Sequence, residues 1–316
     1  MTRIDASKWS WILAGVALGV AVLLIVPTML LMHANAGLSY GSLFVPLLVN
    51  ALIGLVMVLA VALVVGQGVL ERRPGLMVRS PGVLIGCFFV CYLVVAGVIS
   101  YAWGWLTAIS VAHAGSLFSS MRYWQWMFAM TRWLPSVVSF WLALRLTLLL
   151  CRLPADASTT QPSADTRHRG HASVIFSTVF LACCITVMQA ALIWQFKVPG
   201  DGWVLGVAVA AALAFTCSAW LGAWIGLKYQ RGDRVRPGLL ALAALGTWLA
   251  PAILLAGLAV IVFFLFYGSG DLDTSLLVGM GLLALVLLLL SPFFLAWGLT
   301  RLVWRRAWVQ PAAVEK

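Results

Sequence analysis

Arg132 is the ionisable residue whose position in this sequence most invites chemistry. It interrupts an otherwise apolar run, after the aromatic stretch 123–128 and just before Trp133. A cation at membrane depth is costly unless it meets a partner or reaches the interface. Arg132 is therefore a candidate contact for an anion or a lipid phosphate at the outer leaflet. The alternative is an interfacial anchor within an aromatic belt, with the membrane span starting later in the chain.

Two acidic residues, Asp271 and Asp273, are expected on the same side of the membrane as Arg132. They lie in the stretch Gly-Ser-Gly-Asp-Leu-Asp-Thr-Ser between two apolar runs. They form a candidate acidic pair for Arg132 or for a cation. Residues of this kind just before a helix also satisfy its free amide groups, so the alternative is a cap for the last apolar run.

Asn50 and Gln189 are the deeper polar residues within the apolar runs. They are candidates for lining a cavity between two halves of the protein. Hydrogen bonding between helices is the alternative. No Asp or Glu lies inside an apolar run, which is unlike most proton relays and ion-coupled pumps.

Motifs for catalysis or cofactor binding are missing from the sequence. It contains no Walker loop, no His-Glu-x-x-His zinc motif and no Gly-x-Ser-x-Gly elbow. His168 and His171 lie beside arginines, where a metal site would need more ligands and less positive charge. The six cysteines lie in or at the ends of apolar runs, which argues against a disulfide framework. We therefore expect no catalytic residue, no metal and no cofactor.

The composition assigns most of the chain to a lipid environment. Hydrophobic residues make up 63% of the 316 residues, and charged residues make up 9%, against about 25% in a soluble domain. About 20 mostly apolar residues cross a bilayer as a helix. Eight runs meet this length, near 9–32, 43–70, 83–107, 124–150, 173–196, 203–227, 239–267 and 275–303.

The basic residues assign an orientation to these eight runs. If both termini are cytoplasmic, all but three of the 20 Lys and Arg residues fall on the cytoplasmic side. The exceptions are Arg122, Arg132 and Lys197. This distribution is the one that the positive-inside rule predicts, so the basic clusters favour membrane topology over nucleic-acid binding.

Two short patterns occur twice. Arg-Pro-Gly-Leu occupies 73–76 and 236–239, and Trp-x-x-x-Arg occurs at Trp141 and Arg145 and again 156 residues later at Trp297 and Arg301. They predict a duplicated four-helix unit, and an even number of spans leaves both copies parallel. The expected organisation is a first repeat at 1–152, a flexible cytoplasmic linker at 153–172 and a second repeat at 173–316.

Two Gly-x-x-x-Gly motifs predict close helix contact, because glycine lets two backbones approach. They lie at Gly15 and Gly19, and at Gly222 and Gly226.

The sequence thus predicts an all-α integral membrane protein with eight transmembrane helices, in a bacterial inner membrane. Its expected function is non-catalytic, as a permease-like or envelope-assembly subunit. Its expected partners are the lipid bilayer and either other proteins or further copies of itself. Two alternatives stay open. One is an integral membrane enzyme acting on a lipid at the outer leaflet, and the other is a signalling or immunity module.

Overall fold

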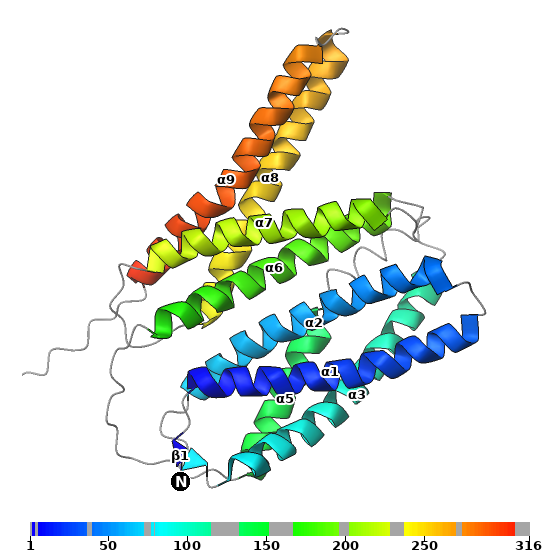
Figure 1. Ribbon diagram of the computed structural model, residues 1–316, viewed down its shortest axis with the longest axis vertical. Coiled ribbons are helices and arrows are strands. Elements are labelled where there is room, and N and C mark those ends of the chain that lie inside the picture. The colour runs from blue at the N-terminus through cyan, green and yellow to red at the C-terminus, as the bar shows by residue number, and fades with distance from the viewer. Residues whose placement is uncertain are drawn as a thin grey trace, which may run out of the picture. The chain divides into compact units, whose positions relative to one another are not determined.

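The computed structural model is almost entirely helical across the residues that it describes, which are 2–3, 6–36, 40–72, 77–78, 80–114, 133–151, 167–195, 202–227, 237–269 and 274–306. The helices within these residues (Figure 1) are α1 (Ala6–Ala36), α2 (Tyr40–Glu71), α3 (Pro81–Ala114), α5 (Trp133–Leu150), α6 (Arg167–Gln195), α7 (Gly202–Gly226), α8 (Pro237–Ser269) and α9 (Thr274–Arg306). A two-residue strand β1 (Thr2–Arg3) pairs antiparallel with β2 (Met77–Val78).

Each of these helices covers one of the apolar runs predicted from the sequence. Lipid offers no hydrogen bonds to the backbone, so an apolar run must satisfy its own amides as a helix. Five helices are long and apolar enough, within the described residues, to cross a membrane: α1, α2, α3, α5 and α7. Shorter apolar stretches, 170–186, 237–251 and 290–303, lie in α6, α8 and α9. The apolar helices indicate an integral membrane protein.

The chain divides into two compact units. Unit 1 comprises 1–162 and 184–209, and unit 2 comprises 163–183 and 210–316. The first repeat expected at 1–152 falls within unit 1. Residues 184–209, expected in the second repeat, group with unit 1 instead.

Unit 1 is built on pairs of packed helices. Helix α1 lies against α2 and α3, and α5 lies against α2 and α3. Figure 1 shows α1 and α2 side by side. The centre is filled by large apolar side chains that are almost fully buried, among them Leu13, Met57, Leu63, Phe88 and Phe140.

Unit 2 contains a hairpin of α8 and α9, which lie side by side (Figure 1). Helix α7 packs against α9, and the start of α6 reaches α7 where Gly170 faces the ring of Trp224. Phe176, Phe180 and Leu240 are almost fully buried in this unit.

Helices α3 and α8 begin in the same way. Each starts at a proline that is followed by glycine, Pro81-Gly82 and Pro237-Gly238. Proline suits the first helical position because an amide proton at that position would have no hydrogen-bond partner within the helix. The two starts lie 156 residues apart, the spacing of the Trp-x-x-x-Arg pattern. The Arg-Pro-Gly-Leu stretch at 73–76 lies outside the described residues.

The linker expected at 153–172 overlaps the first turns of α6, which begins at Arg167. His171, expected in a solvated segment, is a buried residue of that helix. Residues 153–166 lie outside the described residues, so the linker at 153–172 stays a prediction, and its last six residues belong to α6.

Candidate functional site

Most of the site residues expected from the sequence have no described side chain. Arg132, Asp271 and Asp273 lie outside the described residues. Asn50 belongs to α2 and Gln189 to α6, and both fall in unit 1. Their side chains are outside the described set, so a cavity at these two residues stays a prediction.

Among the described residues, the two Trp-x-x-x-Arg pairs are the candidates for a functional site. In α5 the guanidinium carbon of Arg145 lies 5.4 Å from the ring centroid of Trp141. In α9 the same atom of Arg301 lies 5.5 Å from the ring centroid of Trp297. Residues four apart share one face of a helix, and these distances are within the range of cation–π attraction. The sequence pattern therefore produces the same local geometry twice.

The two pairs differ in their surroundings. Arg145 is half-buried, and its Nε is buried with no hydrogen-bond partner among the described residues. Trp141 beside it is exposed. Arg301 is exposed and borders an open pocket of about 470 Å³. In the second pair, the guanidinium group of Arg301 is therefore accessible to a ligand in this pocket.

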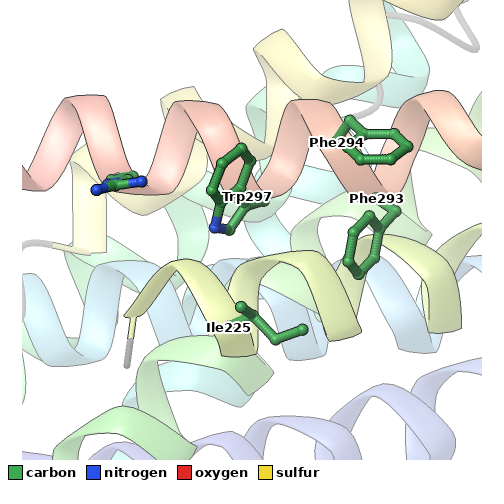
Figure 2. Close-up of a pocket in the computed structure, with 5 residues that line it drawn as sticks. Ile225, Phe293, Phe294 and Trp297 are labelled. Atoms are coloured by element: carbon green, nitrogen blue, oxygen red, sulfur yellow. The ribbon is translucent and has the colours of Figure 1, made fainter. Parts of the chain in front are cut away.

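The pocket lies between α7 and α9 within unit 2 (Figure 2). It is lined by Ile225 of α7 and by Phe293, Phe294, Trp297 and Arg301 of α9. Phe293 and Trp297 extend from α9 toward α7, which carries Ile225 (Figure 2). Phe293 and Phe294 meet edge to face with centroids 5.2 Å apart. The lining is thus apolar along most of its length and cationic at one end.

Two glycines of α7 allow α9 to approach α7 closely beside this pocket. A Cβ placed on Gly222 would overlap the backbone carbonyl oxygen of Phe293. A Cβ on Gly226 would overlap the Thr300 hydroxyl and lie 2.9 Å from the carbonyl oxygen of Trp297. The contact predicted for Gly222 and Gly226 is therefore confirmed, and it holds Phe293 and Trp297 directly against α7.

The corresponding contact in unit 1 involves Gly66 of α2, which lies 156 residues before Gly222. A Cβ on Gly66 would lie 3.5 Å from the ring of Phe140 in α5. Phe140 also packs edge to face against Phe88 and Tyr92 of α3, with centroids 5.4 and 5.9 Å apart. Here the space beside the glycine is filled by an aromatic cluster rather than by a close backbone.

Unit 1 also contains a polar pair that the sequence reasoning did not single out. Gln67 is 1% exposed, and its Nε2 donates a 2.6 Å hydrogen bond to Oε1 of Glu71 one turn later. Glu71 is the one acidic residue in the part of the chain that the structure describes. The four-residue spacing of Gln67 and Glu71 was visible in the sequence, but the burial of Gln67 depends on packing against other helices.

No protein-family model matches the chain, and no curated protein or solved structure is significantly similar to it.

Proposed function

We propose that this chain is a non-catalytic, polytopic subunit of a bacterial inner membrane that works with partner proteins. Of the permease-like and envelope-assembly classes, the geometry favours envelope assembly. The proposed architecture has eight transmembrane helices, arranged as two parallel four-helix repeats with both termini in the cytoplasm.

The buried hydroxyl groups carry the argument for assembly. Four of the five buried threonines among the described residues, Thr147, Thr216, Thr247 and Thr300, each donate to the carbonyl oxygen four residues earlier in their own helix, at 2.5 to 2.8 Å. Such local bonds are the usual alternative to contacts with other helices. Hydroxyl groups that are satisfied within their own helix leave these four positions free to serve helix packing, which suits an assembly subunit.

Recurrent geometry supports the proposed repeat. At a constant separation of 156 residues, Gly66 and Gly222 each face the fourth helix of their proposed repeat. At the same separation, Pro81 and Pro237 start helices. The two Trp-x-x-x-Arg pairs follow the same spacing and stack alike. Three different features that share one sequence separation support a repeat more strongly than a four-residue sequence match does.

The proposed orientation is testable by cysteine labelling in a variant that lacks the native cysteines. Single cysteines at Ser116 and Ser163 should react with membrane-impermeant reagent from opposite sides of the membrane, because the fourth span separates these positions in the eight-span arrangement. Labelling of both from the same side would contradict that arrangement.

Helix α3 offers a surface on which the partner hypothesis can be tested. Its exposed apolar side chains recur at helical spacing, as Val83, Val90, Val94, Val98, Tyr101 and Trp105. Small and β-branched side chains on one face suit either lipid or a second helix. A photo-crosslinking amino acid placed on this face distinguishes the two, because only a protein neighbour gives a product of larger mass on a gel.

The experiment places p-benzoylphenylalanine at Val94, Val98 or Tyr101 in cells that express the chain at its natural level. We expect a discrete protein adduct from at least one position. The matched control is Phe88, an aromatic residue that is 0% exposed, and the probe at this position should give no protein adduct. Unmodified protein at all three exposed positions would contradict a partner on this face, and an adduct consisting of the same chain would identify a homo-oligomer.

A further inference from the structure

The pocket between α7 and α9 has two features that indicate a class of ligand. Its walls are apolar, and a guanidinium group stands at one end. The sequence after Arg301 in α9 is basic, since it includes Arg305 and Arg306. The segment 228–236 that follows α7 in the sequence has four basic residues and one acidic residue, Asp233. A ligand of this pocket should therefore carry an anionic group at one end and a hydrocarbon portion at the other.

We propose that the α7–α9 pocket, lined by Ile225, Phe293, Phe294, Trp297 and Arg301, binds an anionic phospholipid. The phosphate lies at Arg301, and one acyl chain lies over Phe294 and Ile225. Basic pockets between transmembrane helices are typical binding sites for anionic headgroups. This site is distinct from the contact expected at Arg132, since it lies at the basic end of α9 and therefore faces the predicted cytoplasmic leaflet.

Trp297 has a specific part in this arrangement. Its ring lies 5.5 Å from the guanidinium carbon of Arg301. Stacking on an aromatic face restricts a guanidinium while its outer N–H groups can still donate to a phosphate. Tryptophan is also favoured at headgroup depth because one end of the ring is apolar and the other is polar. The pair therefore presents a partly pre-oriented cation at the level where phosphates lie.

The close packing of α7 and α9 explains why the hollow lies at this position. Gly222 and Gly226 bring the two backbones together. Ile225, next to Gly226, is 38% exposed, and Phe294 is 57% exposed. Apolar side chains that are this exposed beside a close helix contact provide a surface on which an acyl chain can lie.

The test uses the full-length chain in nanodiscs and a phosphatidylglycerol that carries a photoreactive diazirine in one acyl chain. Labelled peptides are mapped by mass spectrometry to the α9 segment 291–300. We expect phosphatidylglycerol to label this segment more strongly than phosphatidylcholine with the same acyl probe. Arg301→Gln should lower the phosphatidylglycerol labelling about fivefold, since one basic residue contributes about that factor to anionic-lipid binding.

Two further variants separate the parts of the site. Ile225→Trp fills the groove and should reduce labelling of this segment while Arg301 is retained. Arg145→Gln removes the corresponding cation of unit 1 and should leave labelling of 291–300 unchanged. Circular dichroism of each variant verifies that the helices are intact.

Three results would overturn the proposal. They are equal labelling by the two lipids, labelling that is unchanged in Arg301→Gln, and labelling that is unchanged in Ile225→Trp. Excess inorganic phosphate, compared with chloride at equal ionic strength, distinguishes a lipid site from a site for free phosphate. Loss of the phosphatidylglycerol preference in phosphate alone would show that the pocket binds the free anion, and would equally overturn the proposal.

Discussion

Gly66 in unit 1 and Gly222 in unit 2 lie 156 residues apart in the sequence and make different contacts. The Cβ space of Gly66 borders the ring of Phe140, whereas that of Gly222 is already filled by the backbone of Phe293. The residue that corresponds to Phe140 at the separation of 156 is Ala296, which is fully buried. A bulky side chain thus lies beside Gly66, whereas a main-chain carbonyl group lies beside Gly222. The glycine alone does not set the distance between two helices, because the residue opposite it decides.

The same comparison locates a chemical difference. Gln67 and Glu71 of unit 1 correspond to Ala223 and Leu227 of unit 2. The first pair is joined by a hydrogen bond, while Ala223 and Leu227 are buried apolar residues. Unit 1 therefore has a hydrogen-bonded polar pair at the end of α2, whereas the residues at the end of α7 in unit 2 are apolar. The pocket lies in unit 2, so the Gln67–Glu71 pair and Arg301 are in different units.

The largest expected effect is that of Gly222→Ala. Its Cβ would overlap a main-chain oxygen, which cannot move aside as a side chain can. Overpacking costs about 1–3 kcal/mol where side chains yield, and we expect about 3 kcal/mol here. The measurement is the free energy of unfolding of the purified protein in mixed dodecyl maltoside–sodium dodecyl sulfate micelles, followed by tryptophan fluorescence.

Gly15→Ala is the matched control for this substitution. Gly15 belongs to the other Gly-x-x-x-Gly motif, yet a Cβ there meets nothing within 4 Å. The control should therefore be stabilised slightly, by less than about 1 kcal/mol, because alanine is favoured over glycine inside a helix. Equal destabilisation by Gly15→Ala and Gly222→Ala would mean that the loss at Gly222 does not come from the α7–α9 contact.

The glycine motifs also show which features of the fold could be predicted from the sequence. The helices were predictable, and α8 differs from its apolar run, 239–267, by two residues at each end, because hydropathy and backbone satisfaction depend on the local sequence. The close contact that this motif permits is made at Gly222 and Gly226, whereas a Cβ on Gly15 or Gly19 meets nothing within 4 Å among the described residues. A Gly-x-x-x-Gly motif states that a neighbour can come close, but not that one is there.

The candidate site was harder to predict for a similar reason. The Trp297 and Arg301 pair was visible as a repeated pattern, and its stacking depends only on spacing along one helix. The pocket beside it requires Ile225 from another helix, and this long-range placement leaves no mark in local sequence. The buried Gln67 likewise resembles any polar residue near a helix end until the surrounding helices are known.

The smallest expected effect, and the sharpest test of the comparison, is that of Gly66→Ala. The added Cβ would lie 3.5 and 3.6 Å from two ring carbons of Phe140 and 3.7 Å from Cβ of Ser10, all ordinary van der Waals distances. Alanine is also favoured over glycine inside a helix by about 0.5–1 kcal/mol. We therefore expect Gly66→Ala to stabilise the protein by less than about 1 kcal/mol in the same micelle titration. A loss as large as that of Gly222→Ala would show that α2 and α5 approach as closely as α7 and α9, and the difference between the two units would disappear.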